Sequence, residues 1–332
     1  MKKTLFIIMA FIFCNGFSHA QRTDRYTIVS YNVENLFDTV KTSGKNDADF
    51  TPDGKKKWNT EKYFNKLKNI AKVISSIDSC GCPAIVGLVE VENKKVVEDL
   101  ISADTLNKCK YSIVHFESGD PRGIDNAIIY RKDIVKLING KNFLMAVPRN
   151  GYTYRHDFLY SIFGIEGDTI HVFLNHFKAR SSKPSDSTEV KRVLQAKYLK
   201  TKIDSLQGKD SKAKIIIMGD FNDNPSDSSI AKVLYTFPFP PAYPVYFLNP
   251  FFSIFEKGIG TYKYIDEWNL FDQIILSSGL NDAPSGFKYI DGSAAIFNPE
   301  WLYYTDKKTE KKKPDMLFSD HFPVYIVIEK KK

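Results

Sequence analysis

The sequence has few cysteines, no internal repeat and no long apolar run beyond its first twenty residues. Four cysteines in 332 residues are too few for a disulfide-rich scaffold, and Cys80-Gly81-Cys82 lacks a second Cys or His pair at zinc spacing. No later run reaches the roughly 20 apolar residues that a membrane-spanning helix needs. A composition of 43% hydrophobic and 26% charged residues also excludes disorder and fibrous repeats. We therefore expect a folded chain without stable membrane insertion.

The first twenty residues have the pattern of a secretory signal peptide. Two lysines precede an apolar run from Leu5 to Phe13, and Ser18-His19-Ala20 is a small-x-small cleavage site. Cys14 offers a lipoprotein alternative, which the bulky residues before it disfavour. We expect residues 1–20 to be removed on export, and residues 21–332 to form a single catalytic domain that is secreted or periplasmic.

Three cysteines remain in the expected mature chain: Cys80, Cys82 and Cys109. In an oxidising compartment this number predicts one disulfide and one free thiol. Either Cys80 or Cys82 is expected to pair with Cys109, which would join the two ends of a strand–helix unit. The pattern leaves the choice between the two open.

The chain is basic, with a formal net charge of +8 that stays positive when the two leader lysines are left out. This excess favours a phosphate-rich partner, and we expect a nucleic acid substrate. The sequence implies no protein partner. The lysine-rich run Lys307–Lys313 is expected to be a solvated loop, with contact to a polyanion as the alternative.

Short apolar runs rich in Ile, Val and aromatic residues predict buried strands. They are Thr27–Tyr31, Ala84–Val91, Asn126–Tyr130, Phe158–Ile165, Ile170–Leu174, Lys214–Met218, Gln273–Leu276 and Pro323–Ile328. The strands outnumber the predicted helices and do not alternate strictly with them. This order favours stacked sheets with helices outside over a repeated strand–helix barrel.

Three segments show helical spacing of apolar residues. The first runs from Tyr63 to Ile77 with Asn59 or Thr60 as its cap, and a shorter one covers Lys94–Ile101. The third begins at Ser187 or Thr188, ends at Gly208, and is predicted to bury Val190, Val193, Leu194, Tyr198, Leu199, Ile203 and Leu206.

The remaining long segments are predicted to be irregular: Thr39–Gly54, Pro238–Gly260 and Leu280–Pro314. The aromatic stretch Tyr235–Phe255 contains several prolines, and we expect it to pack over a sheet edge. Stacking on unpaired bases is the alternative.

Carboxylate, carboxamide and imidazole side chains follow many of the predicted strands. They are Asn32 and Glu34, Glu90, Asn175 and His176, Asp220 and Asn222, Asp272, and Asp320 and His321. Strand ends meet at the rim of a sheet, where carboxylates and carboxamides would bind a hard divalent cation and imidazoles would supply acid–base groups. The other histidines have simpler interpretations: His115 and His171 are expected within strands, and His156 in a surface loop.

This ordered set of motifs resembles the endonuclease/exonuclease/phosphatase superfamily, the fold of pancreatic deoxyribonuclease and the abasic-site endonucleases. The motifs are Ser30–Phe37, Gly87–Asn93, Asn175–Arg180, Gly219–Asp223 and Ser319–His321. The resemblance implies an α+β fold, a four-layered α/β/β/α sandwich with two mixed sheets face to face and helices outside. It also implies a phosphoesterase that uses Mg²⁺, with Mn²⁺ or Ca²⁺ as alternatives.

The resemblance assigns a metal-binding role to four residues. Glu90 is expected to be the principal ligand, with Asn32 and Glu34 beside it and Asp320 completing the set. The family more often has Asp where Glu34 stands.

The catalytic roles implied by the resemblance fall on five further residues. Asp220 and Asn222 are expected to hold the attacking water and the scissile phosphate. His176 and His321 would flank the phosphorus, with Asp272 orienting His321. A histidine held in one tautomer by a carboxylate contributes roughly 10²–10⁴-fold to a rate. Which histidine is the acid and which the base stays open.

Basic residues near these motifs are candidates for binding the substrate: Arg122, Lys178 and Arg180. We therefore expect a secreted, Mg²⁺-dependent endonuclease that cleaves DNA or RNA by metal- and histidine-assisted attack of water. A lipid or small-molecule phosphoesterase, sphingomyelinase-like or acting on inositol phosphates, is the alternative. A catalytically silent binding protein is disfavoured by the intact set of site residues.

Overall fold

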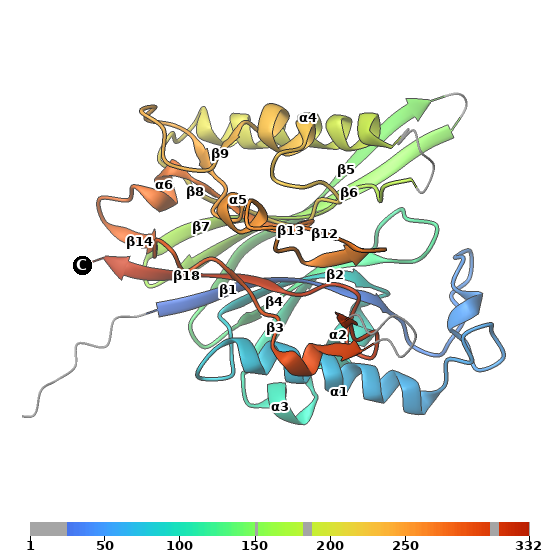
Figure 1. The fold of residues 1–332 in the computed structure, drawn as a ribbon. Coiled ribbons are helices and arrows are strands. Elements are labelled where there is room, and N and C mark those ends of the chain that lie inside the picture. The colour runs from blue at the N-terminus through green and yellow to red at the C-terminus, as the bar shows by residue number, and fades with distance from the viewer. Residues whose placement is uncertain (1–24, 150–151, 182–187, 306–311, 332) are drawn as a thin grey trace, which may run out of the picture.

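Two mixed β-sheets lie face to face, with helices on both outer faces (Figure 1). The computed structural model describes residues 25–149, 152–181, 188–305 and 312–331. The expected signal peptide, residues 1–20, lies outside these ranges, as does most of the run Lys307–Lys313. The four layers confirm the predicted α/β/β/α sandwich.

The first sheet has seven strands in the order β14-β18-β1-β2-β4-β3, with β15 also paired to β18. Their bounds are β1 (Arg25–Leu36), β2 (Ile85–Val91), β3 (Tyr111–His115), β4 (Asp125–Arg131), β14 (Gly286–Tyr289), β15 (Ala295–Ile296) and β18 (Val324–Lys331). Only β1 and β2 run parallel. Three helices cover the outer face: α1 (Thr60–Ile77), α2 (Lys94–Ile101) and α3 (Asp104–Asn107).

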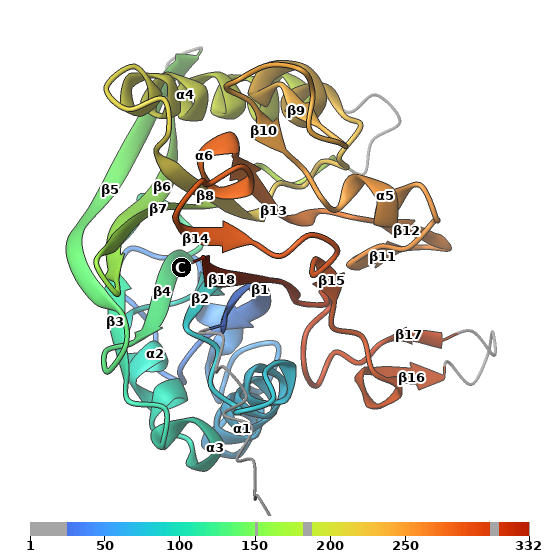
Figure 2. The ribbon, with the colours of Figure 1, turned by 90° about the vertical axis from the view of Figure 1, so that its left-hand side faces the viewer.

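The second sheet has the order β5-β6-β7-β8-β13-β10-β9. Its strands are β5 (Lys136–Arg149), β6 (Tyr152–Ile165), β7 (Asp168–His176), β8 (Lys214–Asp220), β9 (Thr236–Phe237), β10 (Phe247–Leu248) and β13 (Asp272–Ser277). Helix α4 (Glu189–Gln207) packs on its outer face together with a π-helical segment, Ser228–Leu234. Figure 2 shows α4 and α1 on opposite sides of the two sheets.

Several short elements lie outside the two large sheets and the helices that cover them. They are the hairpins β11–β12 (Tyr262–Tyr264 and Glu267–Asn269) and β16–β17 (Tyr303–Thr305 and Lys312–Pro314), α5 (Phe252–Phe255), α6 (Ser278–Asn281) and the 3₁₀ turns Ala48–Phe50 and Glu300–Leu302. No helix of the described ranges combines the length and apolarity needed to cross a membrane.

The inner strands are apolar on both faces because each sheet is covered on both sides. Along β1, Ile28 packs between the two sheets, whereas Val29 and Tyr31 face the helices. Both layers bury these side chains completely. The continuous apolar runs in the sequence follow from this arrangement.

Several predicted irregular segments contain regular structure. Pro238–Gly260 includes β10 and α5, and Leu280–Pro314 includes β14, β15 and β16, so those two expectations were wrong in part. Strands β3 and β5 were not predicted either. These are short or peripheral elements, and β3 and β5 are the edge strands of their sheets, where the apolar pattern is weak.

The predicted inner face of α4 was also wrong in part. Val190 and Leu194 are exposed, by 58% and 36%, whereas Arg192 and Gln195 are buried. Arg192 donates to Asp223, which compensates for its loss of water, and Oε1 of Gln195 accepts from the backbone N–H of Lys178, whereas Nε2 of Gln195 has no hydrogen-bond partner among the described residues.

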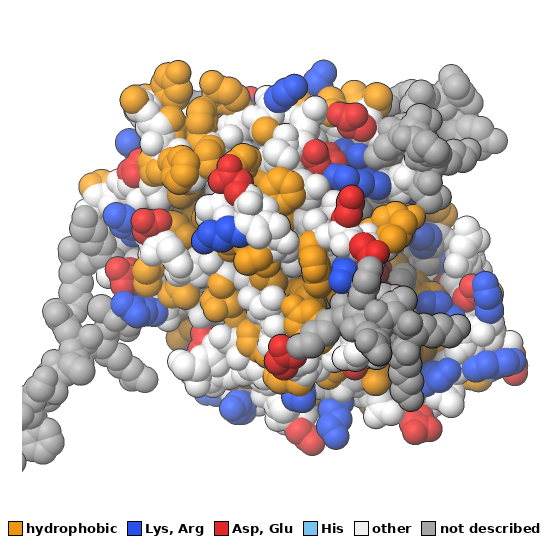
Figure 3. Space-filling view, in the orientation of Figure 1, with side chains coloured by type: hydrophobic (Ala, Val, Ile, Leu, Met, Phe, Trp, Pro, Cys, Tyr) orange, Lys and Arg blue, Asp and Glu red, His pale blue; other side chains and the backbone are white. Residues whose placement is uncertain are grey.

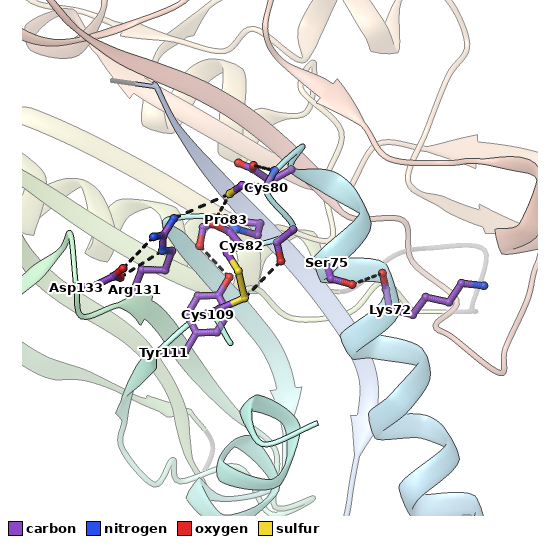
Figure 4. Close-up of a disulfide and its surroundings, with 11 residues drawn as sticks. Lys72, Ser75, Cys80, Cys82, Pro83, Cys109, Tyr111, Arg131 and Asp133 are labelled. Atoms are coloured by element: carbon purple, nitrogen blue, oxygen red, sulfur yellow. Dashed lines mark hydrogen bonds and ion pairs between the residues drawn. A yellow bond between two sulfur atoms is a disulfide. The ribbon is translucent and has the colours of Figure 1, made fainter. Parts of the chain in front are cut away.

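The structure resolves the choice among the cysteines (Figure 4). Cys82 and Cys109 form a disulfide, and Cys80 is exposed as a free thiol. The bond joins the start of β2 to the start of β3, so it closes the segment that contains α2 and α3.

The stretch Tyr235–Phe255 is divided between core and surface. Phe247 and Phe251 are buried, as expected for packing over the sheet edge. Tyr235, Phe239 and Tyr243 are more than half exposed. Apolar side chains gather in the upper left of Figure 3, where Figure 1 places β9.

Candidate active site

The strand ends bring the predicted residues together at one rim of the sandwich. A cavity of about 340 Å³ opens there. Seven of the predicted residues line it: Glu90, His176, Arg180, Asp220, Asn222, Asp320 and His321. They come from the ends of β2, β7 and β8 and from the turn before β18.

His321 forms a close pair with Asp272. The Nδ1 atom of His321 lies 2.7 Å from Oδ2 of Asp272, and both side chains are buried. Burial alone would lower the pKa of His321, but the carboxylates of Asp272, Asp320 and Asp220 outweigh it and raise that pKa well above its ordinary value. The Nε2 atom lies 3.9 Å from a carboxylate oxygen of Asp220 and 3.9 Å from one of Asp320.

Asp220 is the centre of a second buried network. Its Oδ2 accepts a hydrogen bond from Nδ2 of Asn32 at 3.0 Å, and its Oδ1 accepts one from the backbone N–H of Asn222 at 2.8 Å. Burial raises the pKa of Asp220 to about 7, against the opposing charge of His321. His176 approaches the same carboxylate, with Nε2 3.8 Å from Oδ2. The carboxyl group is thus held in place by donors on two sides and titrates near neutral pH.

Glu90 and Glu34 form the other half of the site. Burial raises the pKa of both carboxyl groups, and the nearby charge of Asp320 raises them further. The backbone N–H of Asn35 donates to Oε2 of Glu90 at 3.0 Å, and His176 Nε2 lies 3.7 Å from Oε1 of Glu90.

These carboxylates fit a divalent cation. The negative charge of Asp320 raises the pKa of both Glu90 and Glu34, so a cation between these groups would be stabilised, and oxygen donors suit Mg²⁺, Mn²⁺ or Ca²⁺. Oε2 of Glu34 has no hydrogen-bond partner among the described residues. Glu90, Glu34 and Asp320, with the amide of Asn32 beside them, would hold the ion. The ammonium group of Lys66 lies 3.6 Å from Oε2 of Glu34 and neutralises part of the remaining charge.

Among the described residues, two sets of His, Asp and Glu side chains have ligand atoms close enough together to hold a metal. One consists of Asp220, Asp272 and His321, whose ligand atoms are within 4.8 Å of one another. In this set Nδ1 of His321 and Oδ2 of Asp272 are hydrogen-bonded to each other, whereas Oδ1 of Asp272 has no hydrogen-bond partner among the described residues. The other set is His115, Glu117 and Asp125.

The backbone at the site adopts conformations that side chains normally avoid. Glu34, Asn35, Glu90 and Asn222 all have positive φ, of 51°, 50°, 67° and 49°. Such conformations cost about 1–3 kcal/mol each and concentrate at functional sites. Gly219 has φ +135°, and a Cβ atom there would lie 1.9 Å from the carbonyl oxygen of Asn175. The glycine before Asp220 is therefore required by the close approach of β7 and β8.

The three residues predicted to bind the substrate differ in their contacts with the rest of the protein. The guanidinium of Arg122 pairs with Asp120, with Nη2 2.9 Å from Oδ2, and its charge lowers the pKa of Glu90 against the larger effect of burial. Burial and the charge of Arg122 lower the pKa of Lys178. Arg180 lines the cavity, donates to the carbonyl oxygen of Asn222 at 3.0 Å and stacks on Phe271. Arg122 and Lys178 therefore lie near the site, while these contacts hold Arg180 in the wall of the cavity.

Two buried basic residues near the site, Lys66 and Arg192, were not predicted. Lys66 lies on the inner face of α1, three residues after Tyr63 and four before Ile70, at helical spacing. Arg192 donates from Nε to Oδ1 of Asp223 at 2.7 Å. In the sequence Lys66 is marked only by its core position on the amphipathic helix α1, and Arg192 has no such mark because polar and apolar residues do not separate into two faces along α4.

The three other histidines of the described residues lie within strands. His115 and His171 lie within strands as predicted, and both form cross-strand contacts: Nε2 of His115 is 2.9 Å from Oδ2 of Asp125, and Nδ1 of His171 is 2.7 Å from the hydroxyl of Tyr160. His156 belongs to β6, so the expected surface loop was wrong.

The fold and the site together define the class of the protein. The chain belongs to the endonuclease/exonuclease/phosphatase family, whose model matches residues 27–330. It is therefore a phosphoesterase of this family, whose members use divalent metal ions.

Solved structures with the same fold come from several organisms. One is a family member from Bacteroides thetaiotaomicron, with a TM-score of 0.61 and 17% identity over 93% of this chain and 99% of that one. A mannosyl-6-phosphatase from the same species has a TM-score of 0.57 and 16% identity over 91% and 99%. D. rerio TDP2 complexed with a single-strand DNA product has 0.56 and 18% over 92% and 99%. No curated protein sequence matches the chain.

Proposed function

We propose that this protein is an exported, Mg²⁺-dependent nuclease that hydrolyses phosphodiester bonds in DNA or RNA. The observation that carries the proposal is the meeting of the His321–Asp272 pair, Asp220 and the Glu90 carboxylate in one cavity. The basic side chains of Arg122 and Lys178 nearby and the positive net charge favour a polyanion. The DNA product held by D. rerio TDP2 supports the same substrate class. Export rests on the signal-peptide pattern of residues 1–20.

Each catalytic group has a physical role in such a reaction. Asp220, with a pKa of about 7 and two fixed donors, is placed to orient the attacking water and accept its proton. The raised pKa of His321 keeps its Nε2 protonated, so that it donates a hydrogen bond to a phosphoryl oxygen. His176 is placed to donate to the phosphate from the other side.

The metal site supplies the remaining charge stabilisation. When bound, Mg²⁺ would polarise a phosphoryl oxygen and offset the negative charge that develops on it. Glu90 and Glu34 would hold the ion beside the phosphate, because Glu90 lines the cavity next to His176 and the charges of Glu90 and Asp320 both act on Glu34.

A small phosphorylated polyol is the second candidate substrate. The cavity is of a size that encloses a single small ligand, and its wall includes Glu267 and Asn269, which bind hydroxyl groups readily. The similarity of fold to a mannosyl-6-phosphatase agrees with this alternative.

A substrate panel tests the proposal. The mature chain is incubated with plasmid DNA, single-stranded DNA, RNA, sphingomyelin, inositol phosphates and mannose 6-phosphate, each with Mg²⁺ and with a chelator. We expect Mg²⁺-dependent cleavage of a nucleic acid. Release of phosphate or phosphocholine from the small or lipid substrates, with both nucleic acids intact, would assign the site to the alternative instead.

A further inference from the structure

The β11–β12 hairpin presents one chemically distinct face to the catalytic cavity. In its register Tyr262 pairs with Asn269 and Tyr264 with Glu267. Paired residues of an antiparallel ladder point to the same side, and residues two apart along a strand do too. All four side chains line the cavity. We call this set, Tyr262, Tyr264, Glu267 and Asn269, the hairpin face.

The opposite side of the hairpin fixes it to the protein. Trp268 points away from the cavity and stacks on Phe322, with ring centroids 5.6 Å apart and planes 26° apart. The backbone N–H of Phe322 donates to the carbonyl oxygen of Thr261 at 2.8 Å. The hairpin is therefore anchored to the residue that directly follows His321.

The base of the hairpin face touches the catalytic histidine. Tyr262 and His321 form a β-bridge, and their ring centroids are 4.8 Å apart. Oδ1 of Asn269 accepts a hydrogen bond from Asn224 at 3.2 Å. A group bound on this face would thus lie beside the scissile phosphate in a fixed position.

The hairpin face has no basic residue. It offers two phenol rings, a carboxylate and a carboxamide, and Tyr264 is 50% exposed at its outer end. Arg180, the basic residue of this cavity, is engaged by Asp227 and by the carbonyl of Asn222. The carboxylate of Glu267 repels a phosphate, whereas rings and hydroxyl groups find partners here.

The other two predicted basic side chains, Arg122 and Lys178, occupy a different region. His176 borders both the catalytic cavity and a smaller one lined by Asp120, to which Arg122 is bonded. The charge of Arg122 also lowers the pKa of Lys178, so the two cations lie near each other. The site is therefore asymmetric, with cations beyond His176 and an acidic, aromatic wall beside His321.

We propose that the hairpin face is a subsite for an uncharged ring that carries hydroxyl groups, namely the terminal nucleoside of a nucleic acid. The inference rests on the proposed nuclease function. The ring would stack on Tyr264, its hydroxyl groups would bond to Glu267 and Asn269, and the phosphate chain would leave towards Arg122. This narrows the expected endonuclease to an enzyme that cleaves next to a chain end.

Kinetics on matched oligonucleotides test the subsite. Three substrates share one sequence: one ends in hydroxyl groups, one carries a 5′-phosphate and one a 3′-phosphate. We expect the terminal phosphate at one of these ends to lower kcat/KM by about five- to tenfold, the effect of one like charge across a partly exposed site. Glu267→Gln should remove most of this discrimination, and Glu267→Lys should reverse it. Tyr264→Ala should raise KM with little change in kcat.

Two variants serve as controls. Glu98→Gln removes an exposed carboxylate on α2, and Lys263→Ala alters the side of the hairpin that faces away from the cavity. Both should behave as the unmodified protein. Equal kcat/KM for all three oligonucleotides, unchanged in the Glu267 and Tyr264 variants, would overturn the proposal.

Binding of uncharged probes separates the subsite from the nuclease function. Saturation-transfer NMR is recorded with adenosine and with methyl mannoside on the unmodified protein and on Tyr264→Ala. Adenosine binding that Tyr264→Ala abolishes supports the proposed subsite even if no oligonucleotide is cleaved, in which case only the nuclease function fails. Binding of methyl mannoside alone would overturn the nucleoside assignment, and binding of neither probe would overturn the subsite.

Discussion

Nδ1 of His321 lies 2.7 Å from Oδ2 of Asp272, and the two residues come from different segments that meet at the rim of the second sheet. This carboxylate fixes the orientation of the imidazole and favours its protonated form. Asp272→Asn should lower kcat/KM by roughly 10²–10⁴-fold, and His321→Asn by a similar factor. Because the two act as a unit, the double variant should lose little more than either single one. Steady-state kinetics on the best substrate of the panel measure all three, and additive losses would show that the pair does not act as one unit.

Glu90 links metal binding to pH. Burial raises the pKa of its carboxyl group, so protons compete with a cation up to a higher pH than they do at an exposed glutamate. Since only the deprotonated form binds metal, the affinity for Mg²⁺ or Mn²⁺ should increase as the pH rises from 5 to 8. Isothermal titration calorimetry on the metal-free protein measures this trend. Glu90→Gln should lose most of the affinity, and an affinity that is the same at every pH would contradict the assignment of Glu90.

The fold could be predicted from the sequence because its central strands are buried on both faces. Runs such as Ala84–Val91 and Lys214–Met218 are continuous and apolar, and both form strands close to the expected bounds. Edge elements gave no such signal. Strand β5 contains Lys136 and the pair Asn139-Gly140, which are typical of a turn, and its pairing with β6 shifts register at this point.

The site could be predicted in its residues but not in its supporting contacts. Polar side chains at strand ends mark a rim, so Glu90 and Asp220 were found directly. Lys66 and Arg192 were missed because the burial of a cation is recognised only when its partner, Glu34 or Asp223, is placed in three dimensions.

The buried ion pair of Arg192 and Asp223 should be important for stability. Both side chains are 2% exposed, and removing one partner leaves an uncompensated buried charge. Arg192→Met should lower the free energy of unfolding by about 3–5 kcal/mol, and adding Asp223→Leu should restore part of the loss. Denaturant unfolding followed by circular dichroism measures both.

An exposed pair provides the matched control. Arg25 and Glu329 lie 3.5 Å apart, with Arg25 61% exposed. Arg25→Met should cost less than about 1 kcal/mol. Equal losses of unfolding free energy from Arg192→Met and Arg25→Met would mean that the buried pair contributes no more to stability than the exposed pair.

The Cys82–Cys109 disulfide should stabilise the first helical layer. It closes a loop with a sequence separation of 27 residues, for which loop-closure entropy gives about 3–4 kcal/mol. Replacing both cysteines by serine should lower the melting temperature by several degrees, while Cys80→Ser should leave it unchanged. A melting temperature that depends on Cys80 instead would favour the Cys80–Cys109 pairing.

Restoration of activity by metal tests the central claim most directly. Chelator-treated protein is mixed with a single-stranded oligonucleotide, and the rate of phosphodiester hydrolysis is measured while Mg²⁺ is added back. The unmodified chain should recover its activity in a saturable way, and Glu90→Gln and His321→Asn should each stay at least about 10²-fold slower at saturating metal. Hydrolysis that needs no metal, or that both variants carry out at the unmodified rate, would contradict the account.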